Sequence, residues 1–198
     1  MRLTIATRNA HKTREFALLF GDAFVVDDLN TATHLPLVEE TGNTFAENAV
    51  LKAMAAARVI AGMIVADDSG LEVDALGGAP GIYSARYAGP EASDGANIAK
   101  LLAALDLVTS SVAQPAARFR CALALASGGE LLGTFDGVVE GTIVSVPRGD
   151  KGFGYDPIFL PHGFAQTFGE LDAQTKNRIS HRAAATSALR SALLKKQR

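Results

Sequence analysis

Apolar residues occur along the chain in short blocks separated by polar turns, and their spacing predicts a mixture of strands and helices. Short continuous apolar runs, which are typical of buried strands, occur at 2–6, 23–26 and 63–66. Apolar residues at helical spacing predict helices at 15–20, 44–58, 93–105 and 180–195. Two further apolar runs, 119–126 and 131–135, flank a Gly-Gly pair and predict an antiparallel hairpin, with a separate strand at 138–146 and polar loops at 35–43 and 106–116.

The helix that begins after Thr44 has the clearest start signal. Thr44 and Glu47 have the spacing of a capping box. Asn48 and Lys52 are four residues apart and therefore share a face of this helix. Because the helix separates two predicted strands, the order is typical of a βαβ unit. With the hairpin, it predicts a mixed-sheet α/β protein of two lobes, forming one domain over residues 1–198.

Two adjacent carboxylates follow the apolar run at 63–66, in the segment Asp67-Asp68-Ser69-Gly70. Ligands of open α/β sheets lie beyond the carboxyl ends of strands, so this is a candidate site. Side chains alternate along a strand, so Asp67 and Asp68 are expected to have different roles, one of them as a ligand of a hard cation such as Mg²⁺. The alternative is an ordinary turn, where Asp, Ser and Gly are common.

Three more polar clusters lie at the ends of predicted elements. The segment from Thr7 to Lys12 opens a helix, and a helix N-terminus with free backbone N–H groups suits phosphate; a solvated turn is the alternative. Glu39 and Glu40 are adjacent acids in a loop, and one of them could complete a carboxylate site with Asp67 and Asp68.

The segment 149–157 contains three glycines and Phe153, which could stack on a nucleobase, or it could be a glycine-rich hairpin with packing aromatics. His181 and Arg182 fall in the first turn of the last helix, where cations oppose the helix dipole, and this mild misfit suggests a ligand.

Composition narrows the function classes. The formal charge of −2 over 198 residues argues against a broad nucleic-acid-binding surface. The single cysteine, Cys121, is at an apolar alternating position and is interpreted as a buried structural thiol in a reducing compartment. The histidines lack zinc-site spacing, and no export signal or membrane span is visible, so we expect a cytoplasmic protein without a membrane partner.

Taken in order, these clusters resemble the motifs of the inosine triphosphate pyrophosphatase family. The resemblance covers nearly the whole chain, in seven segments: 7–12, 39–42, 45–49, 66–70, 77–87, 153–157 and 180–182. It implies a long central mixed sheet flanked by helices, with the nucleotide in a cleft between two lobes. It also implies a homodimer, Mg²⁺ dependence, and hydrolysis of non-canonical purine nucleoside triphosphates (ITP, dITP and XTP) to the monophosphate and pyrophosphate.

The resemblance assigns roles to individual residues. We expect Asp68 to be the general base and a metal ligand together with Glu40, and Asp67 to support them; whether Glu39 or Glu40 meets the metal stays open. The residues expected to contact the substrate are Thr7, Arg8, Asn9, Ala10, His11, Lys12, Lys52, Ser69, Phe153, Gly154, Tyr155, Asp156, Lys176, His181 and Arg182.

Two details concern specificity. Arg8 occupies a position where many family members have glycine, and we expect it to add a positive contact to the phosphates. Arg182 has only donors, so near the purine edge it would favour the oxo group of hypoxanthine or xanthine over the amino group of adenine. The alternatives are a nucleotide-binding or sensing protein without turnover, and a pyrophosphatase for other modified or canonical nucleotides.

Overall fold

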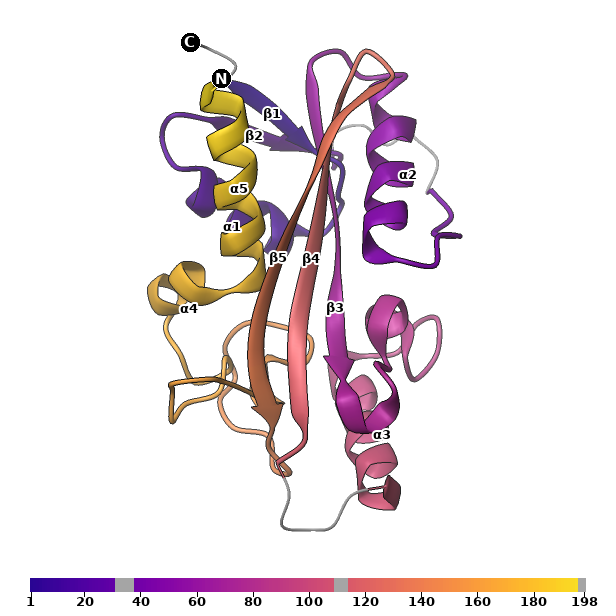
Figure 1. Cartoon of the computed structure of the whole chain (residues 1–198), viewed down its shortest axis with the longest axis vertical. Coiled ribbons are helices and arrows are strands. Elements are labelled where there is room, and N and C mark those ends of the chain that lie inside the picture. Colours follow the sequence, from indigo (N-terminus) through magenta and orange to yellow (C-terminus); the bar gives the residue numbers. More distant parts are fainter. Residues whose placement is uncertain (31–37, 109–113, 196–198) are drawn as a thin grey trace. The chain divides into compact units, whose positions relative to one another are not determined.

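The structure, a computed structural model, describes residues 1–30, 38–108 and 114–195. The strands are β1 (Arg2–Ile5), β2 (Val25–Asp28), β3 (Met63–Val73), β4 (Ala116–Ser127), β5 (Glu130–Ile143) and β6 (Phe159–Pro161) (Figure 1). The helices are α1 (Ala10–Phe20), α2 (Phe45–Ala57), α3 (Asp94–Val108), α4 (Ala173–Ile179) and α5 (His181–Lys195), with short 3₁₀ turns at Asp74–Leu76, Gly81–Arg86 and Asp156–Ile158.

The six strands form one mixed sheet in the order β2-β1-β3-β4-β5-β6. β1 pairs in parallel with both β2 and β3, whereas β5 pairs with β6 in antiparallel orientation. The predicted α/β class with a mixed sheet flanked by helices is therefore confirmed.

The chain divides into two compact units. Unit 1 comprises 1–68, 121–137 and 181–198, and unit 2 comprises 69–120 and 138–180. Each unit has its own apolar core. The core of unit 1 includes Leu3, Ile5, Phe16 and Phe20, and that of unit 2 includes Leu71, Phe119, Phe159 and Phe168. The prediction of one continuous domain with a nucleotide cleft stays a prediction.

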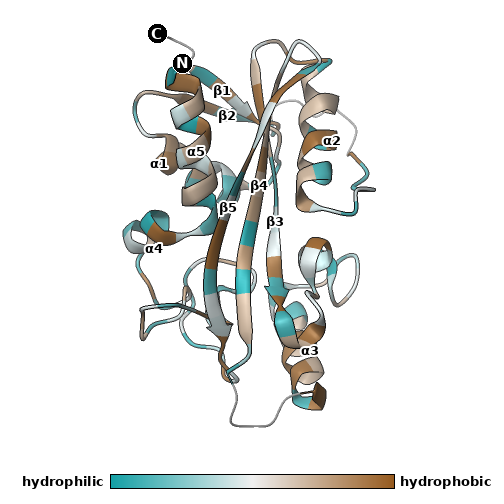
Figure 2. Ribbon diagram, in the orientation of Figure 1, coloured by the Kyte–Doolittle hydropathy of each residue, from teal (hydrophilic) through white to brown (hydrophobic). Residues whose placement is uncertain are grey.

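Unit 1 positions the start of α1 and the middle of β3. Helix α1 begins after Asn9, whose side chain caps it, and ends at Gly21, which has a positive φ of 64°. It packs against α5, so these two helices lie together although they are far apart in sequence (Figure 1). The hydropathy colouring shows hydrophilic and hydrophobic residues along each of these helices, as expected for helices that bury only one face (Figure 2).

Several predicted elements are confirmed closely. α2 starts after Thr44, whose hydroxyl accepts a hydrogen bond from Glu47 N, while Glu47 Oε2 accepts one from Asn43 N. The β4–β5 hairpin turns at Gly128 and Gly129, both with positive φ, as a two-residue hairpin loop requires. Cys121 is buried, and burial raises the pKa of its thiol, in agreement with a structural role.

Other predictions were wrong. The segment 138–146 is not a separate strand, because β5 runs without interruption through Gly141 to Ile143. Gly141 does not interrupt the strand. The backbone of β6 lies close to it, since a Cβ at this position would be 2.4 Å from the backbone oxygen of Leu160. The polar linker predicted at 106–116 is helical up to Val108 and becomes β4 at Ala116, and residues 109–113 lie outside the described residues. β2 begins two residues later than expected, and β6 and α4 were not predicted. Residues 35–37 of the expected loop at 35–43 lie outside the described residues, as do residues 31–34 before it.

Candidate active site

The carboxylates Asp67 and Asp68 lie within a strand and not in a turn after it. β3 continues through Asp67, Asp68, Ser69 and Gly70 to Val73, so the prediction that the strand ends at the acid pair was wrong. Both side chains are buried, with 3% and 7% of the residue surface exposed. A buried carboxylate needs charged or hydrogen-bonding partners, and both residues have them.

The two neighbours have different partners, as alternation along a strand predicts. Asp67 Oδ1 lies 2.8 Å from Lys12 Nζ, and Asp67 Oδ2 lies 3.5 Å from Arg182 Nε. Burial alone would raise the pKa of Asp67, but Lys12, Arg182 and Lys52 together lower it below its usual range. The lowered pKa favours the ionised form of Asp67, which lies beside two cations.

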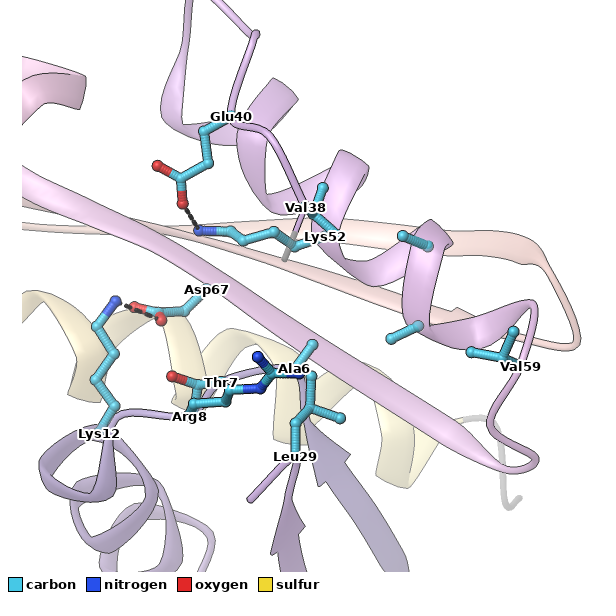
Figure 3. A pocket seen from close by; sticks show the side chains of 12 residues that line it. Ala6, Thr7, Arg8, Lys12, Leu29, Val38, Glu40, Lys52, Val59 and Asp67 are labelled. Carbon is cyan, nitrogen blue, oxygen red and sulfur yellow. Dashed lines mark hydrogen bonds and ion pairs between the residues drawn. The ribbon is translucent and has the colours of Figure 1, made fainter. Parts of the chain in front are cut away.

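Asp68 shares a cation with Glu40. Lys52 Nζ, from α2, lies 3.0 Å from Asp68 Oδ1 and 2.7 Å from Glu40 Oε1 (Figure 3 draws the Glu40 bond). Burial raises the pKa of Asp68; Lys52 lowers it and Glu40 raises it again, and the net shift is upward. Of the two adjacent acids, Glu40 contacts Lys52, whereas Glu39 is exposed.

The amide of Asn48 completes the surroundings of Asp68. Asn48 is fully buried in α2, and its Nδ2 donates to Asp68 Oδ2 at 3.2 Å. Its Oδ1 accepts from Gly42 N at 2.8 Å. The sequence predicted that Asn48 and Lys52 share a helix face, and both side chains do reach Asp68.

A cavity of about 340 Å³ lies in unit 1 beside these groups. Its wall combines cationic, acidic and apolar side chains (Figure 3): Ala6, Thr7, Arg8, Lys12, Leu29, Val38, Glu40, Lys52, Ala55, Ala56, Val59 and Asp67. Six of the residues predicted from sequence therefore line one cavity: Thr7, Arg8, Lys12, Glu40, Lys52 and Asp67. The apolar wall could not be recognised in the sequence, because Leu29, Val38 and Val59 are ordinary apolar positions in their own segments.

The start of α1 differs from its prediction in one respect. Asn9 Oδ1 accepts hydrogen bonds from His11 N and Lys12 N, and Thr7 Oγ1 accepts one from Asn9 N. The expectation that this helix start offers free backbone N–H groups to a phosphate was therefore wrong for His11 and Lys12. Cationic side chains, those of Arg8, Lys12 and Lys52, supply the positive charge of this cavity.

Arg182 and His181 occupy the first turn of α5, as predicted, and are buried. Arg182 Nη1 lies 3.1 Å from Glu15 Oε2, on α1, in addition to its contact with Asp67. These two acids compensate the unfavourable position of a cation at a helix N-terminus. Glu15 was missed in the sequence, since a single acid on a helix surface gives no local signal of a distant partner.

Ala10 is the first residue of α1, in unit 1, whereas five other predicted residues lie in unit 2: Phe153, Gly154, Tyr155, Asp156 and Lys176. Asp156 Oδ2 accepts from Phe153 N at 2.9 Å and lies 2.6 Å from Lys176 Nζ. Lys176 Nζ also lies 5.1 Å from the centre of the Phe153 ring, a cation–π distance. Gly154 N donates to Asp94 Oδ2, and Tyr155 Oη donates to the carbonyl of Ser84. Ser69, also in unit 2, is half-buried in β3.

Glu40 and Asp68 are two carboxylates that contact the same cationic group, the ammonium of Lys52. No group of three or more Asp, Glu, His or Cys side chains within residues 1–30, 38–108 and 114–195 could hold a metal ion. None of the described helices is long and apolar enough to cross a bilayer.

The sheet and the unit 1 cavity define an α/β protein with a cavity lined in part by Arg8, Lys12 and Lys52, next to two carboxylates that share the ammonium group of Lys52. Residues 3–192 match the Ham1 family, and the chain belongs to this family.

The chain is similar over nearly its full length to curated relatives. It is 52% identical over 188 residues to a dITP/XTP pyrophosphatase of Geobacillus kaustophilus, covering 94% of this chain and 91% of the relative. It is 48% identical to the dITP/XTP pyrophosphatase of Bacillus subtilis, covering 93% of both chains. The resemblance inferred from the motifs is therefore confirmed.

Solved structures agree with the assignment of the chain to the Ham1 family. The Ham1 protein of Staphylococcus aureus has a TM-score of 0.85 with 41% identity and full coverage of both chains. A HAM1 protein of Coxiella burnetii has a TM-score of 0.88 with 41% identity, covering 98% of this chain and 99% of that one.

Proposed function

We propose that the protein hydrolyses non-canonical purine nucleoside triphosphates, such as ITP, dITP and XTP, to the monophosphate and pyrophosphate with the help of Mg²⁺. The observation that carries the proposal is the contact of Lys52 with both Glu40 and Asp68, at the wall of a cavity that also holds Lys12 and Arg8. The printed names of the similar proteins, dITP/XTP pyrophosphatases, support the same substrate class.

The residues present fit a divalent cation. Mg²⁺ is usually bound through one or two carboxylates, with water and substrate phosphates as its other ligands, so Glu40 and Asp68 suffice. Their oxygens already hold one cationic group, the ammonium of Lys52. When bound, the metal would neutralise charge that develops on the phosphate oxygens.

Asp68 is the proposed proton acceptor. Its raised pKa makes it a better base than an ordinary aspartate at neutral pH, because general-base catalysis favours a pKa near the working pH. It accepts a proton from the water that attacks the α-phosphorus. The bond from the α-phosphorus to the bridging oxygen breaks, and pyrophosphate leaves with that oxygen.

Side chains of unit 1 would hold the triphosphate. Lys12, Lys52 and Arg8 supply charge-assisted hydrogen bonds, which are the strong ones for phosphate. Thr7, Asn9, Ala10 and His11 are proposed as further contacts, and so is Ser69, which follows Asp68 in β3. Because Asn9 Oδ1 caps α1, its own contribution is to fix the helix start that carries Lys12.

The purine is proposed to contact Phe153, Gly154, Tyr155, Asp156 and Lys176, with His181 and Arg182. Phe153 would stack on the base, while Arg182 donates to the oxo group that distinguishes hypoxanthine and xanthine from adenine. Asp156 and Lys176 hold each other in place, which limits the conformations open to both.

A panel of triphosphates tests the proposal. With Mg²⁺ we expect ITP, dITP and XTP to release pyrophosphate faster than ATP and GTP, with no orthophosphate as first product. Asp68→Asn serves as the control for contaminating activity. Binding of ITP without turnover would favour a sensing protein instead, and equal rates on all five nucleotides would favour a pyrophosphatase of broader range.

Homodimer formation and a cytoplasmic location belong to the same proposal and rest on the family resemblance. Light scattering coupled to size-exclusion chromatography would test the first, with a mass twice the 20.7 kDa of the chain expected.

A further inference from the structure

Asn48 is bound at both ends of its amide. The oxygen accepts from Gly42 N at 2.8 Å, and the nitrogen donates to Asp68 Oδ2 at 3.2 Å. A backbone N–H can only donate and a carboxylate can only accept, so the two partners fix which way the amide points. The side chain is fully buried, where leaving either bond unmade would be costly.

The two bonds join two separate chain segments. Gly42 follows Glu40 by two residues in the loop before α2, and Asp68 lies in β3. The loop approaches Asn48 closely: a Cβ on Gly42 would lie 2.8 Å from Asn48 Oδ1 and 2.6 Å from Glu47 Cβ. Glycine at 42 therefore permits the short bond that ties the Glu40 segment to α2.

Asn48 also limits what Asp68 can do. Its amide occupies Asp68 Oδ2, while Oδ1 of the same carboxylate faces Lys52, which in turn contacts Glu40. One oxygen is thus held by the amide, and the other is directed toward the position where a cation contacts both acids.

We propose that Asn48 is a positioning residue that sets the separation and orientation of the Glu40 and Asp68 carboxylates for binding a divalent cation. The proposal rests on the proposed function, since it assumes that these carboxylates are the metal ligands. Removing a residue that hydrogen-bonds to a metal ligand typically weakens metal binding by about 10- to 100-fold.

The chain contains a matched control for a purely structural role. Asn97, in α3 of unit 2, is also buried and also ties a loop to a helix. Its Oδ1 accepts from Ala88 N at 2.8 Å, and its Nδ2 donates to the carbonyl of Ala85 at 3.3 Å. Both of its partners are backbone groups, and neither is a carboxylate.

The experiment compares Asn48→Ala with Asn97→Ala in the full chain. Both variants should lower the melting temperature. Mn²⁺ binding without nucleotide, measured by electron paramagnetic resonance, should weaken about 10- to 100-fold in Asn48→Ala and change less than about twofold in Asn97→Ala. The Mg²⁺ concentration for half-maximal ITP hydrolysis should rise in parallel only in Asn48→Ala.

Gly42→Ala provides a second variant if Asn48→Ala does not fold. It keeps the amide but forces the Glu40 loop away from it, so Mn²⁺ binding should weaken as well. Unchanged Mn²⁺ affinity in the folded variants, or equal weakening in Asn97→Ala, overturns the positioning role while leaving the proposed function intact. If the wild type itself binds no Mn²⁺, the proposed metal site and the positioning role both fall.

Discussion

Asp67 and Asp68 are neighbours in β3, yet their carboxyl groups respond to the fold in opposite directions: the pKa of Asp67 is lowered and that of Asp68 is raised. Both are buried, and burial alone raises the pKa of each. For Asp67 the cations Lys12, Arg182 and Lys52 outweigh burial, whereas for Asp68 the nearby Glu40 adds to burial and Lys52 does not compensate. One residue is suited to holding cations and the other to accepting a proton.

The same substitution at the two positions should therefore have different consequences. Asp67→Asn leaves Lys12 and Arg182 without their shared counter-charge and should lower the free energy of unfolding by about 3 kcal/mol or more. Asp68→Asn removes a carboxylate whose ionisation is unfavourable, and should change stability by less than about 1 kcal/mol. Turnover of ITP should nevertheless fall at least about 100-fold in Asp68→Asn. Urea unfolding and initial rates on the same preparations check both; full activity in folded Asp68→Asn would exclude it as the base.

The pH dependence of stability should separate the two residues in metal-free protein. Asp67 has a folded pKa below its unfolded value of about 3.9, so its contribution is present above that pH and is lost as the pH falls through the folded pKa. Asp68 has a folded pKa above its unfolded pKa. Its contribution to stability is therefore present at pH values below the unfolded pKa and is lost as the pH rises through the folded pKa.

Urea unfolding between pH 3 and 7 measures these slopes. In the wild type, the free energy of unfolding should decrease as the pH rises through the folded pKa of Asp68, and Asp68→Asn should lack this decrease. The free energy of unfolding should also decrease toward the acid end of the range, and in Asp67→Asn that decrease should be smaller. Identical pH profiles for the wild type and Asp68→Asn would contradict the raised pKa.

Arg8→Gly tests the position where many family members have glycine. Arg8 lines the cavity and carries one of its positive charges. Its removal should raise the KM for ITP about tenfold, since a hydrogen bond to a charged group contributes about 1.5–3 kcal/mol, reduced here because Arg8 is exposed. The value of kcat should change little. A lower KM in Arg8→Gly would mean that the side chain crowds the phosphates.

Arg182→Ala tests the proposed reading of the base. If Arg182 donates to the oxo group, the ratio of kcat/KM for ITP to that for ATP should fall about tenfold or more. The substitution also removes contacts with Glu15 and Asp67 and should destabilise the protein. A ratio of two substrates on one preparation is independent of the folded fraction, so an unchanged ratio would assign Arg182 to the Asp67–Glu15 network alone.

Several elements can be predicted from the sequence because residues close together in the chain specify them. Thr44 and Glu47 cap α2, Gly128 and Gly129 make the hairpin turn, and the apolar spacing of residues 93–105 predicts most of α3. Each depends on residues within a few positions of one another, where hydrogen-bond geometry and side-chain periodicity act directly. The polar clusters likewise pointed to the polar residues that line the unit 1 cavity, but not to its apolar ones.

The partners of the acidic residues, in contrast, depend on contacts that form only in the folded protein. β3 runs through Asp67 and Asp68 because Lys12, Lys52 and Arg182, distant in sequence, supply the charges that allow two carboxylates to be buried in a strand. The choice of Glu40 over Glu39, the capping of α1 by Asn9, and the bond from Asn48 to Asp68 have the same origin. Each depends on which partner lies within hydrogen-bond distance in space, and residue spacing along the chain does not contain that information.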